Sequence, residues 1–428
     1  MITRAKKWIG TDRRLLTNAL IFTLSTIVNK GMNFFILPVL TYYLSKADYG
    51  MLSLITSVTT IAVIYIGFFP SNFIMVKFSK YKKEGMAPYI SNMLLLMLAS
   101  LVAVWGILFL LRSHLFVHYE ERTLLVFMIA LICFFQVFSF ILSTLIQLEQ
   151  NAIKYAAVQF VQTIATLSLA LLLIIQFHWG WKGKFYAEFT IYGLFALFTF
   201  LYMLKHRYIR FDIDPTKIRE LVRYLFPLTF FVLGLFLMGT VDKIFIANMV
   251  GLEEAGVYGI AVTMTFIINM VYDAVLKAWE PRSYQLLESE KAEDRKKVVQ
   301  VTYLFSGFVI LSAALYVLFI PWLFHLMINA KFDHALSFIP ILVIGYAFEG
   351  LRKPISNYLN HIDKVDLVGG VTILAGGLNI VLNYFFIRSF GTVGAAYATA
   401  ISFGVLYFTT LFFVFRYCNL PWLPERAS

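Results

Sequence analysis

GWKGKFYAEFTIYG (residues 180–193) shares three glycines, a tyrosine and an alanine, at matching positions, with GTVGAAYATAISFG (residues 391–404). Turns often use glycine for its conformational freedom, so shared glycines alone do not prove duplication. A second pair, YLSKADYGMLSL (residues 43–54) and MVGLEEAGVYGI (residues 249–260), repeats at an offset of 206 residues, close to the 211 residues of the first pair. Two concordant offsets favour an internal repeat, and hence a protein made of two similar halves.

The composition places both halves in a membrane. Of the 428 residues, 60% are hydrophobic and 14% are charged, and the mean hydropathy is +0.78. A soluble domain of this size needs more polar surface. The net charge of +12 reflects an excess of lysine and arginine, and in a membrane protein such an excess usually lies in the cytoplasmic loops. We therefore expect no nucleic-acid partner.

Twelve segments are apolar and long enough to span a membrane, which takes about 20 residues per helix. They are 15–44, 50–78, 88–112, 122–147, 153–177, 184–205, 220–249, 256–282, 297–324, 334–359, 366–389 and 393–417. The first exceeds the core of a signal peptide and shows no small-residue cleavage site, so we expect it in the mature protein.

Lysine and arginine are concentrated in alternate connections. The basic connections are KFSKYKK, KHRYIRFDIDPTKIRELVR and EKAEDRKK, whereas SKADYG and VGLEEAG are poor in both residues. The positive-inside rule places the basic connections and both termini in the cytoplasm. The outer connections are short, which leaves no room for an extramembrane catalytic domain, so we do not expect an enzyme.

These patterns predict an all-α polytopic membrane protein with 12 transmembrane helices. Six spans per half give the halves the same orientation, so that they surround a central cavity. The predicted parts are an N-terminal lobe (1–210), a cytoplasmic linker (205–219) and a C-terminal lobe (220–428). The two cysteines, Cys133 and Cys418, are far apart and predict neither a disulfide framework nor a metal site.

Lys30 lies near the middle of the first span, with Asn33 within one turn. A charge at the bilayer centre costs about 3 kcal/mol, so it normally faces a water-filled cavity or a partner. Its own span contains no acid. Lys30 therefore either pairs with an acid on another helix, such as Glu188 or Asp242, or lines the cavity.

The eighth span carries Asn269, Asp273 and Lys277 at intervals of four residues, which places them on one stripe. Asp273 and Lys277 can form an ordinary intrahelical pair. Alternatively, Lys277 contacts a substrate near the cytoplasmic end of the span.

In the tenth span, Lys353 is expected to pair with Glu349 one turn away, which leaves Arg352 without a local partner and makes it a candidate ligand for an anion. Asp242 in the seventh span, next to Lys243, either joins helices or holds a coupling ion.

Asn379 and Asn383 in the eleventh span lie one turn apart. They predict hydrogen bonds between helices.

Three stretches resemble one family. They are NKGMNFFILPVLTYYLSKADYGMLSLITSV (residues 29–58), GTVDKIFIANMVGLEEAGVYGIAVTM (residues 239–264) and LNIVLNYFFIRSFGTVGAAYATAIS (residues 378–402). They are similar to signatures of the polysaccharide transporter family, the Wzx-type flippases of the multidrug/oligosaccharidyl-lipid/polysaccharide exporter superfamily. The resemblance implies a fold like that of the multidrug (MATE) exporters. It also implies alternating-access movement of an undecaprenyl-pyrophosphate-linked oligosaccharide to the periplasmic leaflet of a bacterial inner membrane, for O-antigen or other lipopolysaccharide biosynthesis.

The resemblance further implies that a cationic cavity, to which the first span contributes, holds the anionic head group. The candidate substrate-binding residues are Lys30, Asn33, Lys277, Arg352 and Lys353, and the candidates for ion coupling are Asp242 and Asp273. It implies no catalytic residue, cofactor or metal, and it names a polysaccharide polymerase and chain-length machinery as conceivable partners.

Two other functions remain open. A cation-exporting multidrug antiporter of the same superfamily would need acids facing its cavity, where the first half offers Glu188 and Glu149 beside Lys30. A membrane polymerase or ligase would need catalytic patterns such as H-E-x-x-H, G-x-S-x-G or a P-loop, which the sequence lacks.

Overall fold

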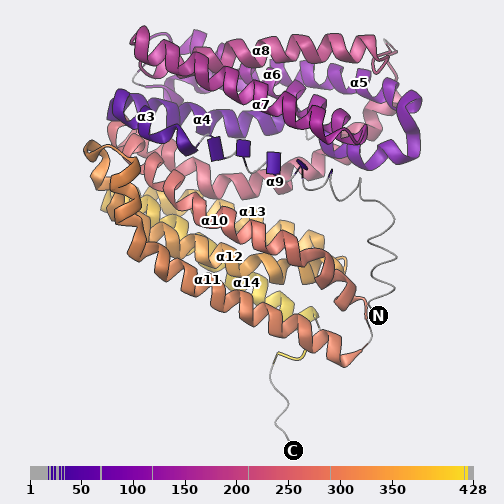
Figure 1. Ribbon diagram of the computed structural model, residues 1–428, viewed down its shortest axis with the longest axis vertical. Helices are drawn as coiled ribbons and strands as arrows, with labels where there is room; N and C mark the ends of the chain where they lie inside the picture. The colour runs from indigo at the N-terminus through magenta and orange to yellow at the C-terminus, as the bar shows by residue number, and fades with distance from the viewer. Residues whose placement is uncertain are drawn as a thin grey trace, which may run out of the picture. The chain divides into compact units, whose positions relative to one another are not determined.

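All regular elements in the described part of the chain are helices (Figure 1). The computed structural model describes residues 34–67, 70–117, 119–210, 212–289, 291–418 and 420–422, together with residues 18, 21–22, 24–25, 28–29 and 31–32. Part of the first predicted span, including Lys30 and Asn33, lies outside these residues. The all-α fold class is confirmed.

The chain forms two compact units. Unit 1 comprises Met1–Leu44 and Val58–Thr229, and unit 2 comprises Ser45–Ser57 and Phe230–Ser428. The boundary after Leu44 precedes α4 (Lys46–Gly67), whereas the boundaries after Ser57 and after Thr229 fall inside α4 and inside α9 (Pro215–Met249). The lobe boundaries expected from the sequence stay a prediction.

Unit 1 is built around α6, which packs against the other long helices of the unit (Figure 1). These helices are α5 (Pro70–Leu115), α6 (Arg122–Leu148), α7 (Ala152–Leu171) with the π-helical turn η1 (Leu172–Gln176), and α8 (Trp181–Lys205). A short α3 (Leu37–Tyr43) precedes α4. Residues 79–87, expected as a cytoplasmic loop between the second and third spans, are instead helical and belong to α5. The break in the chain comes earlier, because α4 ends at Gly67. Pro70 then starts α5, since proline is favoured in the first turn of a helix.

The connection between α8 and α9 is fixed to α5. Asn92 donates from Nδ2 to the carbonyl oxygen of Asp212 at 2.9 Å, and its Oδ1 accepts from the amide of Asp214 at 3.0 Å. One amide side chain thus satisfies two backbone groups of an irregular segment. The segment expected as a linker (205–219) is therefore held within unit 1 up to Asp214, and α9 begins at the next residue.

Unit 2 is built around α12, which packs against α10, α11, α13 and α14 (Figure 1). The elements are α10 (Leu252–Leu287), α11 (Ala292–Met327), the 3-10 helix η2 (Ala330–Ser337), α12 (Ile339–His361), α13 (Val365–Phe390) and α14 (Thr392–Tyr417). Buried aromatic residues, among them Tyr272, Tyr346 and Phe403, fill the space between these helices.

Within the described residues, nine helices are long and apolar enough to cross a membrane. A tenth span results if η2 and α12, which are bent by 52° relative to one another, are taken together. The chain is thus a multi-pass membrane protein, whereas the total of twelve spans stays a prediction.

The glycines of the first repeat occupy equivalent backbone positions. Gly180 precedes α8 with φ 53° and ψ −136°, and Gly391 precedes α14 with φ 63° and ψ −147°. This conformation is nearly restricted to glycine. Three residues later, a Cβ on Gly183 or Gly394 would lie 2.9 or 2.1 Å from atoms of the preceding helical segment. Both hairpins therefore need glycine for the same two reasons.

The glycines of the second repeat contact each other inside unit 2. A Cβ on Gly50 of α4 would lie 1.8 Å from the carbonyl oxygen of Leu252, and a Cβ on Gly256 of α10 would lie 2.2 Å from that of Lys46. The reciprocal contact allows the first turns of the two helices to touch through their backbones.

Candidate functional site

Arg352 of α12 forms a buried ion pair within its own helix. Its Nε and Nη2 donate to the two carboxylate oxygens of Glu349 at 2.7 and 2.8 Å, and both side chains are buried. The expectation that Glu349 pairs with Lys353, leaving Arg352 unpaired, is wrong. The planar guanidinium spans both carboxylate oxygens, which a single ammonium cannot do.

Lys353 instead reaches across to α10. Its Nζ donates to Oδ1 of Asn269 at 2.6 Å and to Oδ1 of Asp273 at 2.5 Å. The Lys353 side chain is 13% exposed and the Asp273 side chain 43%. Among the described residues, Lys277 is exposed and has no ion-pair partner, so the expected intrahelical pair with Asp273 is replaced by this bond between helices.

Close packing beside the cluster holds α10 and α12 together. A Cβ on Gly350 would lie 2.6 Å from the ring of Tyr272, which is fully buried. The Tyr272 hydroxyl donates to the carbonyl oxygen of Val309 in α11 at 3.2 Å. Tyr272 therefore fixes the register of α10, and with it the position of Asp273.

The charges of Asp273, Glu349, Arg352 and Lys353 sum to zero. An anion can bind Lys353 where the Asp273 carboxylate is displaced from it. Half-exposure of Asp273 allows such an exchange, because water can hydrate the released group. Lys277, one turn further along the same stripe of α10, is an exposed second cation.

Asp242 joins α9 to α10. The Tyr258 hydroxyl donates to its Oδ2 at 2.8 Å, and the backbone amide of Lys243 donates to its Oδ1 at 2.8 Å. Asp242 is 1% exposed. This geometry supports the helix-joining alternative, and it leaves a role in ion coupling untested.

The amides of α13 bind both within their helix and outside it. Asn379 donates from Nδ2 to the Ser402 hydroxyl of α14 at 3.3 Å, which confirms the expected bond between helices. Asn383 donates to the carbonyl and side-chain oxygens of Asn379 at 2.9 Å. Its own Oδ1 is buried and has no hydrogen-bond partner among the described residues.

Helices α9 and α13 run in the same direction and pack closely, because a Cβ on Gly376 would lie 3.0 Å from the carbonyl oxygen of Gly234. Asp242 and Asn383 follow these glycines by eight and seven residues, about 11 Å along each helix.

The two acids considered as partners of Lys30 are engaged with other residues. Glu188 pairs with Lys184 in α8 at 3.7 Å, and Asp242 accepts from Tyr258. Lys30 lies outside the described residues, so its pairing stays a prediction.

Sequence reasoning missed the environment of Glu149, at the end of α6. The hydroxyls of Tyr202 and Tyr208 donate to it at 2.7 and 3.3 Å, and Lys154 pairs with it at 3.3 Å. Burial raises the pKa of the Glu149 carboxyl, but the hydrogen bond from Tyr202 and the charge of Lys154 outweigh burial and lower it. The partners come from three segments, so no local sequence pattern indicates them.

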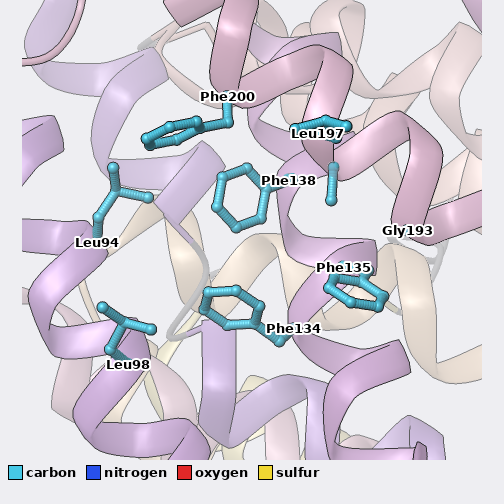
Figure 2. Close-up of a pocket in the computed structure, with 9 residues that line it drawn as sticks. Leu94, Leu98, Phe134, Phe135, Phe138, Gly193, Leu197 and Phe200 are labelled. Carbon is cyan, nitrogen blue, oxygen red and sulfur yellow. The ribbon is translucent and has the colours of Figure 1, made fainter. Parts of the chain in front are cut away.

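Unit 1 also contains an apolar groove of about 370 Å³ between α5, α6 and α8. Figure 2 shows Leu94 and Leu98 on one side of it and the rings of Phe134 and Phe138 on another, with Phe200 at one end. All of its lining residues are apolar, so it suits hydrocarbon chains and offers no cation to a phosphate.

The sequence matches two family descriptions. Residues 15–287, more than half of the chain, match the polysaccharide biosynthesis protein family, and residues 227–385 match the MatE family. The chain belongs to the polysaccharide biosynthesis protein family. This membership confirms the resemblance inferred from the three sequence stretches.

Two curated relatives carry no assigned function. An uncharacterized membrane protein of Methanocaldococcus jannaschii is 22% identical over 214 residues, which are 49% of this chain and 42% of that protein. An uncharacterized membrane protein of Haemophilus influenzae is 23% identical over 279 residues, which are 64% of this chain and 66% of that protein. The match thus spans less than two thirds of either relative.

Solved transporter structures share the fold. An inward-facing multidrug resistance MATE family transporter of the MOP superfamily superposes with a TM-score of 0.73, at 14% identity over 90% of this chain and 94% of that one. The lipid II flippase MurJ superposes with a TM-score of 0.70, at 14% identity over 92% and 87%. The MATE-like fold is therefore confirmed; identity this low carries no information on substrate.

Proposed function

We propose that this protein moves an undecaprenyl-pyrophosphate-linked oligosaccharide from the cytoplasmic to the periplasmic leaflet of a bacterial inner membrane, for O-antigen or similar surface polysaccharide synthesis. Membership of the polysaccharide biosynthesis protein family and a fold shared with a lipid II flippase support this function. The observation that carries it is the ion pair between Lys353 and Asp273, a cation in a membrane-spanning helix bound to an acid that solvent reaches.

In the proposed mechanism, the pyrophosphate displaces Asp273 from Lys353. The ligand brings more negative charge than one carboxylate, and Asp273 becomes hydrated or protonated as it leaves. Lys277, on the same stripe of α10, supplies a second ammonium. Both lysines bind as flexible point charges, which suits a ligand that must be released again. Arg352 stays paired with Glu349 and holds the local backbone of α12.

Lys30 and Asn33, outside the described residues, are proposed to bind the same head group. Lys30→Ala should then insert normally and fail to export glycan, while Lys30→Arg retains part of the activity. Recovery of a poorly inserted Lys30→Ala by deletion of an acid on another helix would assign Lys30 to the fold instead.

Ion coupling is proposed at Asp242 and Asp273. A proton on Asp273 weakens its hold on Lys353 and so favours substrate binding. At Asp242, a proton or a monovalent cation would be held by the buried carboxylate, which the Tyr258 hydroxyl already contacts. Exchange of either ion would link the transport cycle to an ion gradient.

A multidrug exporter is the second candidate, because residues 227–385 match the MatE family. Deletion of the gene distinguishes the two functions. Under the first, surface glycan is lost and lipid-linked repeat units accumulate on the cytoplasmic face. Unchanged surface glycan, with increased sensitivity to cationic drugs, would establish the second.

Both termini are proposed to lie in the cytoplasm. Single cysteines in SKADYG and VGLEEAG should then react with an impermeant thiol reagent in intact cells, whereas cysteines in KYKKEG and RFDIDP should not. Labelling of the second pair would reverse the orientation.

A further inference from the structure

A second pocket of unit 1, with polar lining residues, lies at the hairpin between α7 and α8. Its volume is about 880 Å³, within the range of about 300–1,000 Å³ that is usual for ligand sites. Its lining residues are Leu169, Leu173, His178, Trp179, Lys182, Tyr186 and Thr190. Two leucines form the apolar part, and a lysine, a histidine, a threonine and two aromatic residues form the rest.

The backbone holds this hairpin in an unusual conformation. The π-helical turn η1 ends α7, and such turns are frequent at functional sites. His178 follows with φ 56°, which is uncommon for a residue other than glycine. The amide of Trp179 donates to the carbonyl oxygen of Leu173 at 3.2 Å. Trp179 is therefore attached by its backbone while its side chain remains 46% exposed.

The aromatic side chains of the pocket are supported at their edges. The Trp179 ring meets the rings of Tyr186 and Phe177 at centroid distances of 5.9 and 6.0 Å, with interplanar angles of 74° and 55°. An exposed indole held in this way presents a flat apolar surface with a polar N–H at its rim. The C–H face of a pyranose ring packs well on such a surface.

Lys182 gives the pocket a positive charge. Its Nζ lies 5.7 Å from the centroid of the Tyr119 ring, and it has no ion-pair partner among the described residues. Two acids of the same region are bound to other groups: Glu188 pairs with Lys184 at 3.7 Å, and Glu121 accepts from the Tyr119 hydroxyl at 3.1 Å. Lys182 is therefore available to a ligand carboxylate.

The hairpin between α13 and α14 shows that the fold does not require these side chains. It has the same glycine conformation, but at the repeat offset of 211 residues it carries Ser389, Phe390 and Val393 in place of His178, Trp179 and Lys182. In unit 2, α13 continues to Phe390 as a regular α-helix. The two hairpins thus share a turn conformation, whereas the aromatic and basic side chains of the pocket are found only in the α7–α8 hairpin of the two.

We propose that this pocket binds an acidic sugar, a hexuronic acid unit, with its carboxylate at Lys182 and its ring packed on Trp179. The site belongs to unit 1, whereas the pair of Lys353 and Asp273 belongs to unit 2, and its binding activity does not depend on the proposed head-group site. It would recognise the saccharide part of a ligand rather than its phosphate.

The test measures binding to the full-length protein in nanodiscs of neutral phosphatidylcholine. The probe is a tetrasaccharide of alternating glucuronic acid and N-acetylglucosamine, and saturation-transfer NMR detects the contact. Lys182→Ala and Trp179→Ala should each weaken binding about tenfold, whereas Lys182→Arg should remain within about threefold of the wild type, because the charge is kept.

A matched control uses the neighbouring ion pair. The double variant Lys184→Ala, Glu188→Gln removes a lysine of the same helix without changing the net charge, and it should bind within about twofold of the wild type. If Trp179→Ala is poorly folded, Trp179→Phe, the residue found in the second hairpin, replaces it.

Three results would overturn the proposal. The first is equal binding of the matched tetrasaccharide with glucose in place of glucuronic acid, and the second is undiminished binding by a folded Lys182→Ala. The third is loss of the sugar contact when phosphatidylglycerol replaces part of the lipid, which would identify the pocket as a site for anionic lipid head groups.

Discussion

Two helix interfaces of unit 2 use polar side chains in opposite ways. Between α13 and α14, Asn379 and Ser402 are neutral, hydrogen-bonded to each other and fully buried. Between α10 and α12, Lys353 and Asp273 are charged, and the acid is 43% exposed. The first pair joins consecutive helices over 23 residues of sequence, and the second joins helices over 80 residues.

The difference follows from the energetics of desolvation. A neutral hydrogen bond forms readily in an apolar interface. For a buried ion pair, the hydration energy that the two charges lose is about as large as the energy of their attraction. An ion pair that remains half open to solvent keeps part of its hydration and can exchange partners. The α13–α14 contact therefore suits a permanent helix–helix interface, and the α10–α12 contact suits a binding site.

The largest effect is expected at the pair of Arg352 and Glu349, in which both side chains are buried. Arg352→Ala should lower the stability by about 3–5 kcal/mol, because it leaves the Glu349 carboxylate buried without its partner. Thermal unfolding of the detergent-solubilised protein measures the loss. The double variant Arg352→Ala, Glu349→Gln should recover most of it, and an unchanged single variant would contradict the pairing.

Gly394→Ala tests the close contact between α13 and α14. The new Cβ would lie 2.1 Å from the carbonyl oxygen of Phe386, and backbone atoms cannot move aside, so we expect a loss of about 1–3 kcal/mol. Gly377→Ala in α13 is the control, since its Cβ meets no atom within 4 Å. Equal melting temperatures of the two variants would refute the close approach.

Lys353→Ala should separate stability from function. The remaining Asp273 can be hydrated, so the loss of stability is expected to be about 1 kcal/mol or less. Glycan export in a complementation assay should nevertheless fail. Lys364→Ala, an exposed lysine that precedes α13, should export normally. Normal export by Lys353→Ala would remove this residue from the site.

Ser402→Ala should have the smallest effect. It removes one bond between helices in a membrane protein, which is typically worth about 0.6 kcal/mol. Export per folded molecule should equal that of the wild type. A folded Ser402→Ala protein without export would show that the α13–α14 contact takes part in transport, and the contrast between the two interfaces would disappear.

Hydropathy predicted most helices to within a few residues. The spans expected over 122–147 and 393–417 correspond to α6 (Arg122–Leu148) and α14 (Thr392–Tyr417). A helix that crosses a membrane needs a continuous apolar segment of about 20 residues, so its position can be recognised from that segment alone. The span expected over 50–78 was wrong at its end, because hydropathy does not register the break between Gly67 and Pro70.

The repeat was equally readable from the sequence, because its glycines are required by the backbone. Gly180 and Gly391 adopt backbone angles that other residues avoid, and Gly50 and Gly256 touch where no Cβ fits. Such requirements leave the same residue at the same spacing in both halves.

The charge pairs could not be assigned in this way. Glu349 lies three residues before Arg352 and four before Lys353, so either cation could reach it along the helix. The choice depends on α10, which presents Asp273 to Lys353 from 80 residues away in the sequence. The sequence by itself determined most of the helices, the repeated glycines and the presence of charges in the membrane. Only the tertiary structure decided which charges are paired and which solvent can reach, because pairing depends on side chains that meet across helices.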